Sequence, residues 1–277
     1  PIRPGVSAMS SQIGFWKDVP LAKLVADEFG VKVLVESATR AKAVAERVIG
    51  VGDMAEDMLF VEYGAGIGGA VIAQGRLLLG CAGAAAEFGH THVLEGGPPC
   101  QCGSFGCLEA LAGSSALAAR FRRILQEGGN SLAVELAGGQ PEKVTGWKVL
   151  EAANSGDKIC TAIVEEMGRY LGLGLANLVN LFNPSMVVLD HRLKLAGPAL
   201  LDQLTRIVRL QALGRSSQDL LMQFGRLGDE AGILGAALLV LDSLFEIPAL
   251  KPPQYLLDPS AAESLGGARR ARDAGRA

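Results

Sequence analysis

The stretch AAAEFGHTHVLEGGPPCQCGSFGCLEA, residues 84–110, gathers three of the five cysteines of the chain and two of its three histidines. His90 is followed after nine residues by Cys100, then by Cys102, and after four more residues by Cys107. Imidazole nitrogens and thiolates are the ligands that zinc prefers, and four of them close a tetrahedral structural site with no position left for water. The glycines between the cysteines permit the sharp turns that such convergence needs. We therefore predict a structural Zn²⁺ held by these four side chains.

Two alternatives remain open at this point. His92 lies two residues beyond His90 and competes with it as the nitrogen ligand. The other alternative is that the three cysteines are buried free thiols or contain a redox pair, because spacing alone does not place a metal.

Composition limits the classes of protein to which the chain can belong. The 277 residues are 49% hydrophobic with a net charge of −3, which favours a large core and gives no sign of a nucleic-acid-binding surface. Five cysteines in a chain of this length do not make a disulfide scaffold. The sequence shows no signal peptide and no apolar run long enough to span a membrane, so we expect a cytoplasmic protein. Because the first residue is Pro1, we also expect the fold to be incomplete at its N-terminus.

Hydrophobic periodicity predicts an α/β chain in which helices alternate with buried strands. The strands are expected at 31–37, 58–64 and 185–190, with a pair joined by a glycine turn over 64–80. The helices are expected at 19–30, 38–50, 107–128, 147–156, 158–184, 196–211 and 229–246. Residues 251–277 are rich in Ala, Gly and Arg without periodicity, which predicts a disordered tail.

The run EFGHTHV…GPPCQCGSFGCLEALAG closely resembles the signature of the ROK family of bacterial repressors and sugar kinases. VEYGAGIGGAVIAQGRLLLG resembles the family's second phosphate motif, and LANLVNLFNPSMVVLD its adenosine-side helix and strand, so the likeness covers roughly residues 4–246. It implies an α/β, two-lobed actin-like (ribonuclease H-like) sugar-kinase fold. Residues 1–55 would be the remainder of the N-terminal lobe. Residues 56–250 would be the C-terminal lobe, with the helix at 229–246 packing toward the N-lobe.

The resemblance also implies a sugar site. Glu87, His90 and Glu109 match family residues that hold sugar hydroxyls, and a carboxylate can accept two such hydrogen bonds. His90 would bind zinc through one ring nitrogen and face the sugar with the other. Ser37 offers a further hydroxyl contact. Without the resemblance, Glu109 is equally well explained as an acid at the start of a helix, where the helix dipole stabilises it.

The kinase features of the family are altered. Its catalytic Asn-Asp pair aligns with Ser37 and Ala38, and alanine cannot take a proton. Loss of a positioned base typically costs about 10²- to 10⁴-fold in rate. Glu36 is not expected to replace that base, because on a strand it would face the other way.

The nucleotide side of the site departs from the family as well. Gly64, Gly66, Gly68 and Gly69 keep the glycines of the phosphate loop, whose backbone N–H groups can cradle an anion, but its threonine is Ala65. Where the family has paired glycines beside adenosine, this chain has the run 190–192, Asp-His-Arg, in which a surface-loop histidine is expected. ATP with Mg²⁺ is therefore not expected as a ligand.

These features predict a sugar-binding ROK domain, the effector-sensing part of a transcriptional regulator that has lost kinase chemistry. Its ligand would be a sugar or amino sugar, and DNA would be bound only through an upstream segment outside this sequence. The resemblance implies a dimer or tetramer. The alternatives are an ATP-dependent hexose or N-acetylhexosamine kinase with a displaced base, and a degenerate protein with neither activity.

Overall fold

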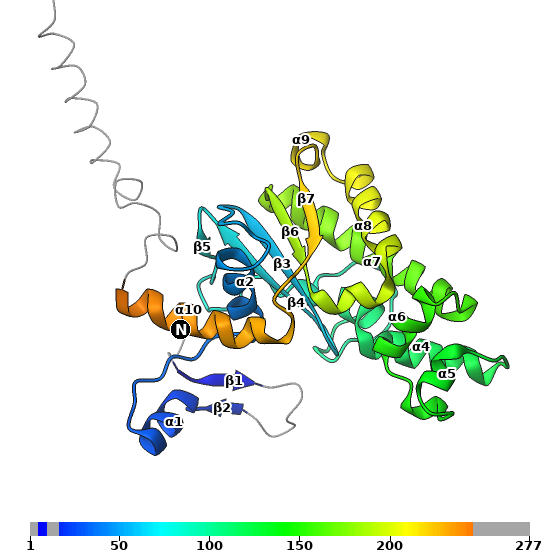
Figure 1. Cartoon of the computed structure of the whole chain (residues 1–277), viewed down its shortest axis with the longest axis horizontal. Coiled ribbons are helices and arrows are strands. Elements are labelled where there is room, and N and C mark those ends of the chain that lie inside the picture. The colour runs from blue at the N-terminus through cyan, green and yellow to red at the C-terminus, as the bar shows by residue number, and fades with distance from the viewer. Residues whose placement is uncertain (1–4, 10–16, 246–277) are drawn as a thin grey trace, which may run out of the picture.

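The computed structural model describes residues 5–9 and 17–245 (Figure 1). The disordered tail expected at 251–277 lies outside these residues. Within them, a five-stranded sheet forms the centre of the molecule. None of the described helices combines the length and the apolar character that a membrane span needs.

The sheet has the strand order β5-β4-β3-β6-β7. β3 pairs antiparallel with β4, which pairs antiparallel with β5, whereas β3–β6 and β6–β7 are parallel. A meander of three strands followed by two parallel strands is the ribonuclease H-like topology. The strands are β3 (Met58–Tyr63), β4 (Ile67–Ala73), β5 (Arg76–Leu77), β6 (Met186–Leu189) and β7 (Leu221–Phe224). The expected strands at 58–64, 64–80 and 185–190 are therefore confirmed.

Alternating residues of the strands face two separate cores, because successive side chains of a strand point to opposite faces. Met58 and Phe60 pack with Ala43 of α2 (Ala38–Val48) on one face. Leu59 and Val61 pack on the other face in a larger core with helix α7 (Lys158–Phe182). α6 (Gly146–Asn154) and α8 (Pro198–Gln211) flank α7.

The last helix, α10 (Ala231–Phe245), packs against α2 (Figure 1). A Cβ added at Gly235 would lie 1.7 Å from the carbonyl oxygen of Ala41, so the close approach of the two helices requires glycine. α2 also carries the buried Glu46, which accepts hydrogen bonds from the N–H groups of Leu227 (2.8 Å) and Val51 (3.2 Å). These bonds fasten the segment that enters α10 to the end of α2.

The remaining elements are short, apart from α4. At the N-terminus they are β1 (Ser7–Met9), β2 (Lys17–Val19) and α1 (Leu21–Phe29). Between β5 and α6 lie η1 (Phe88–His90), α3 (Leu108–Ala112), α4 (Ser114–Gln126), α5 (Leu132–Leu136) and η2 (Pro141–Lys143). Toward the C-terminus lie η3 (His191–Ala196), α9 (Gly214–Ser217) and η4 (Gly228–Glu230).

Two expectations from periodicity are wrong. Residues 31–36 form no strand, and Val31, Leu34 and Val35 are exposed. A strand needs a neighbour to pair its backbone groups, and the described residues offer none here. The single helix expected at 107–128 divides into α3 and α4, because Gly113 is extended (ψ 155°).

Candidate metal centre and ligand site

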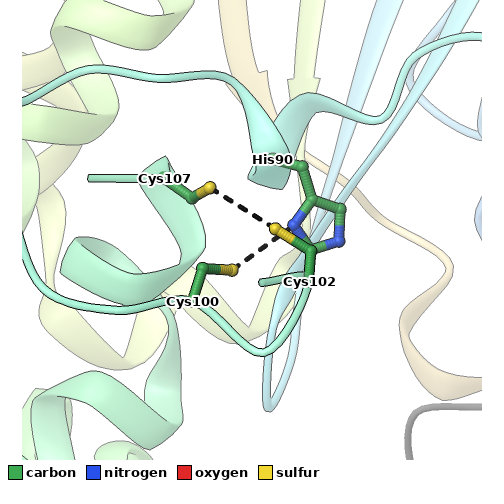
Figure 2. A group of neighbouring side chains, drawn as sticks. All are labelled: His90, Cys100, Cys102 and Cys107. Carbon is green, nitrogen blue, oxygen red and sulfur yellow. Dashed lines mark hydrogen bonds between the residues drawn. The ribbon is translucent and has the colours of Figure 1, made fainter. Parts of the chain in front are cut away.

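Four side chains form the cluster that the sequence predicts. The nitrogen of His90 and the sulfurs of Cys100, Cys102 and Cys107 lie within 4.8 Å of one another, and Figure 2 shows the four side chains gathered at one point. His90 Nδ1 is 3.6 Å from Cys100 Sγ, and the sulfurs of Cys102 and Cys107 are 3.7 Å apart. Tetrahedral zinc with Zn–S of about 2.3 Å and Zn–N of about 2.0 Å separates N from S by about 3.5 Å and S from S by about 3.8 Å. The donor set and its spacing therefore fit zinc.

The backbone of the knuckle, residues 91–107, explains this convergence. The N–H of Cys100 donates to the carbonyl oxygen of Ser104 at 2.8 Å, which closes a tight turn between the first two sulfurs. Gly106 has φ +66°, and a Cβ there would lie 1.9 Å from the carbonyl oxygen of Leu94. Glycine is thus required on both conformational and steric grounds.

The two histidines have different surroundings. His92 Nδ1 lies 2.9 Å from the carbonyl oxygen of Phe105. The backbone of His92 also forms an isolated β-bridge with that of Cys107. His90, at the end of η1, is the histidine that joins the three sulfurs. Cys100, Cys102 and Cys107 are free thiols, so they form no disulfide.

The thiols also differ in their electrostatic environments. A backbone hydrogen bond from Ser104 lowers the pKa of Cys102, which is exposed. Burial raises the pKa of Cys107 to about 11. A bound metal cation would overcome this cost, because zinc binds the thiolate form.

Glu109, His90 and Glu87 lie around the start of β4. Glu87 precedes η1, His90 is its last residue, and both are exposed. Glu109 lies in the first turn of α3, and its Oε2 accepts the N–H of Ile67 at 3.0 Å. A Cβ at Gly89 would lie 2.2 Å from the carbonyl oxygen of Ile67, so η1 is pressed against the same strand. The cysteine cluster, which joins His90 to the residue before α3, holds both elements in place.

Ser37 and Ala38 form the N-terminus of α2, with Ser37 as its N-cap and Ala38 exposed in its first turn. Glu36 is not on a strand, which corrects the expectation from sequence. Its Oε1 accepts the N–H of Ser37 at 2.7 Å and Nε of Arg40 at 2.6 Å. The carboxylate is thus turned toward its own helix by two donors.

The glycine loop adjoins both α2 and α3. A Cβ at Gly66 would lie 1.8 Å from Glu109 Oε2, and a Cβ at Gly68 would lie 2.8 Å from Thr39 Oγ1. Gly69 approaches the carbonyl oxygen of Ala86 in the same way, at 2.8 Å. Close packing therefore accounts for these glycines without a phosphate.

The loop is also fastened to α4. The carbonyl oxygen of Gly64 accepts the N–H of Ser114 at 3.2 Å, and that of Ala65 accepts the N–H of Ser115 at 3.2 Å. The first N–H groups of α4 therefore donate to carbonyls of the loop. Without these hydrogen bonds, the same N–H groups would be free to bind an anion.

Sequence reasoning missed a polar contact beside this loop. Thr39 donates a hydrogen bond to Glu62 of β3, and Glu62 also pairs with Lys42. The sequence did contain a signal for this contact. Glu62 is the one charged residue of β3, and Thr39 and Lys42 are one turn apart on α2.

The run 190–192 lies at the carboxyl ends of β3 and β6. Asp190 is buried, and its Oδ1 accepts the N–H of Arg192 at 2.9 Å. The Arg192 side chain pairs with Asp229, and its guanidinium carbon lies 5.7 Å from the ring of Trp147. His191 is half-buried between Asp190 (3.3 Å) and Asp229 (3.6 Å). His191, Arg192, Asp229 and Trp147 are among the residues that border a cavity of about 430 Å³.

A model of the ROK family matches residues 5–243. The chain belongs to the ROK family. It is 28% identical over 233 residues to the xylose repressor of Caldicellulosiruptor bescii, covering 84% of this chain and 58% of that protein. It is 34% identical over 231 residues to a glucokinase of Halalkalibacterium halodurans, covering 81% of this chain and 68% of that protein.

The crystal structure of a ROK family glucokinase from Streptomyces griseus in complex with glucose and AMPPNP is also similar, with a TM-score of 0.74. It is 32% identical, and the match covers 81% of this chain and 73% of that one. The ROK chain described here therefore has the actin-like, ribonuclease H-like fold. It spans little more than half the length of the xylose repressor, and both repressors and kinases are among its relatives.

Proposed function

We propose that this ROK chain is the effector-sensing part of a transcriptional regulator, that it binds a sugar or amino sugar, and that it does not transfer phosphate. Ala38 carries this proposal. It stands where the family resemblance expects the general base, and alanine has no group that accepts a proton.

Two acids close to the start of α2 are engaged elsewhere. Glu36 accepts hydrogen bonds from the backbone of Ser37 and from Arg40. Across the start of α2, Glu62 is held by Thr39 and Lys42. A general base must reach the hydroxyl proton of the substrate, and both carboxylates already have two donors.

The nucleotide side supports the same conclusion. Phosphoryl transfer depends on positioning and on charge stabilisation around the phosphates. Arg192 and Asp229 pair at the carboxyl end of β6, where the resemblance expects glycines and a close approach to adenosine. The loop carbonyls of Gly64 and Ala65 meet the N-terminus of α4. This arrangement favours a protein that binds sugar without ATP.

The sugar side retains its polar groups. Glu87, His90 and Glu109 are brought to one strand by η1 and α3, which the cysteine cluster joins. Zinc would lock these elements together and would leave one nitrogen of His90 for a sugar hydroxyl. Ser37 would add a hydroxyl from α2.

In the proposed regulator, sugar binds one arrangement of the lobes more tightly than another and so changes DNA affinity through an upstream segment. We propose a dimer or tetramer, a cytoplasmic location, and a boundary between lobes near residue 55. The second candidate is a sugar kinase with a displaced base, which is favoured by 34% identity to a glucokinase.

The test is ADP release in a coupled assay with Mg-ATP and glucose, xylose or N-acetylglucosamine. We expect no ADP above the rate without sugar, while the same preparation binds at least one of the sugars. The Halalkalibacterium halodurans glucokinase serves as the positive control. Sugar-dependent ADP release by this chain would replace the sensor with the kinase.

A further inference from the structure

Arg40 lies in the first turn of α2 and connects two parts of the proposed sugar site that are far apart in the sequence. Its Nε donates to Glu36 Oε1 at 2.6 Å, and the same oxygen accepts the N–H of Ser37 at 2.7 Å. Its Nη1 donates to the carbonyl oxygen of Gly83 at 2.9 Å. One guanidinium therefore links the N-terminus of α2, which carries Ser37, to the segment that leads to Glu87.

That segment, residues 79–85, follows β5 and has few other attachments. Most of its residues are exposed. Its backbone hydrogen bonds are internal, such as the one from the N–H of Ala85 to the carbonyl oxygen of Leu79 at 3.1 Å. Among the residues that the structure describes, the bond from Arg40 is the only hydrogen bond that ties the segment 79–85 to another part of the chain. The place of the segment therefore depends on this arginine.

Ala86, which separates the segment from Glu87, has a left-handed backbone with φ +66°. A residue with a Cβ adopts this conformation at a cost, so it persists only where the surrounding structure holds it. On its C-terminal side the buried Phe88 holds it, through an N–H that donates to the carbonyl oxygen of Ala86 at 2.6 Å. On its N-terminal side the hold passes through Arg40. Release of the segment would let Ala86 relax and would turn the exposed Glu87 carboxylate.

The Arg40 guanidinium is itself held in place. It pairs with Glu36, and the two side chains are only 16% and 28% exposed. An arginine presents its donors in a rigid plane, so the pairing with Glu36 fixes the direction of the bond to Gly83. Hydrogen bonds from a charged donor are also stronger than those between neutral groups.

We propose that Arg40 is a positioning residue of the sugar site. It holds the segment 79–85 so that the Glu87 carboxylate faces the same sugar as Ser37, and it acts through Glu87 without contacting the sugar. Such preorganisation increases affinity because the loop is already ordered before the ligand arrives. The inference rests on the proposed sugar site for its ligand.

The experiment is a double-mutant cycle on the full chain. Arg40→Ala, Glu87→Ala and the double variant are titrated by calorimetry with glucose, xylose and N-acetylglucosamine. If Arg40 acts through Glu87, its effect on affinity disappears once Glu87 is gone, whereas a general structural defect adds to the loss. Amide hydrogen exchange of the segment 79–85, measured without ligand on the same proteins, reports whether Arg40 holds it.

Two further variants separate positioning from general stability. Arg226→Ala is the matched control, because Arg226 also donates to two backbone carbonyls, those of Ile49 (2.7 Å) and Gly50 (2.9 Å), at the other end of α2. Arg40→Lys keeps the positive charge and a hydrogen-bond donor but loses the planar fork, so it should recover part of the affinity.

We expect Arg40→Ala to weaken sugar binding about tenfold, which lies within the range for residues of one network. It should also speed exchange in the segment 79–85, and it should add little to the loss in Glu87→Ala. Arg226→Ala should change neither readout.

Equal affinities of Arg40→Ala and wild type would overturn the inference and leave the sensor proposal standing. Additive losses in the cycle, or an equal loss in Arg226→Ala, would overturn it too. Faster exchange in Arg40→Ala, with no sugar bound by any of the proteins, would support the hold on the segment and overturn the sensor.

Discussion

Replacing Cys102 with serine tests the metal centre with little disturbance of the core. Cys102 is exposed, so exchanging its sulfur for oxygen leaves no cavity behind. Its sulfur is 3.7 Å from that of Cys107, which is buried at the start of α3. A change in stability would therefore report the loss of a zinc ligand rather than a packing defect.

The size of the effect follows from linkage between metal binding and folding. If removing one thiolate weakens zinc binding about a thousandfold, the stabilisation lost at saturating zinc is about 4 kcal/mol. A chain of this size shifts its melting temperature by about 2–4 °C for each kcal/mol, which gives a fall of about 8–16 °C. The knuckle and the elements joined to it, η1 and α3, should lose order first.

The assay is zinc content by mass spectrometry together with thermal unfolding, with and without a chelator. The protein should carry about one zinc ion per chain, as expected for a four-ligand site. Cys102→Ser should be zinc-poor and insensitive to the chelator, whereas Cys81→Ser, an exposed cysteine outside the cluster, should behave like the wild type. Equal zinc contents and melting temperatures for Cys102→Ser and wild type would refute the structural-metal account.

Three further predictions concern single carboxylates. Glu109→Ala should weaken sugar binding about tenfold or more while zinc is retained, and an unchanged calorimetric affinity would remove Glu109 from the site. Glu46→Ala leaves two part-buried N–H groups without this acceptor and should cost about 3 kcal/mol in urea unfolding; a cost below about 0.5 kcal/mol would contradict this. Burial alone would raise the pKa of Asp157, but hydrogen bonds from Cys160 and Leu132, among others, lower it overall. Its contribution to stability is therefore present above the unfolded pKa of about 3.9 and is lost as the pH falls through the lower folded value. Asp157→Asn should flatten that part of the stability curve between about pH 5 and pH 2, and parallel curves for the two proteins would show that the carboxylate is not the cause.

Local signals explain what the sequence could predict about the fold. β3 and β6 are short apolar runs buried on both faces, and α7 begins at the capping Asp157 and ends at Asn183 in the left-handed conformation. β7 was missed because it is a four-residue edge strand whose pairing with β6 is set by residues far away in the chain. The segment 31–36 has strand-like composition, but composition does not supply a neighbouring strand.

The candidate site, like the fold, was predictable only where the signal is local in the sequence. The cysteine cluster was predictable because four donors within eighteen residues must fold on one another, and only the choice between His90 and His92 needed coordinates. The ion pair Arg120–Glu166 joins residues that are 46 apart in the sequence, so no local pattern could predict it. The glycine loop shows a limit of motif reasoning, because its glycines are explained by close packing as well as by phosphate.

The central claim is that this ROK chain binds sugar without ATP. The most direct test is calorimetric titration of glucose, xylose and N-acetylglucosamine into the full chain, with and without Mg-ATP. The account predicts binding of at least one of these sugars, with an affinity that Mg-ATP does not change and with heat that ends when the site is full. Binding that requires Mg-ATP, or heat that continues as turnover, would contradict it.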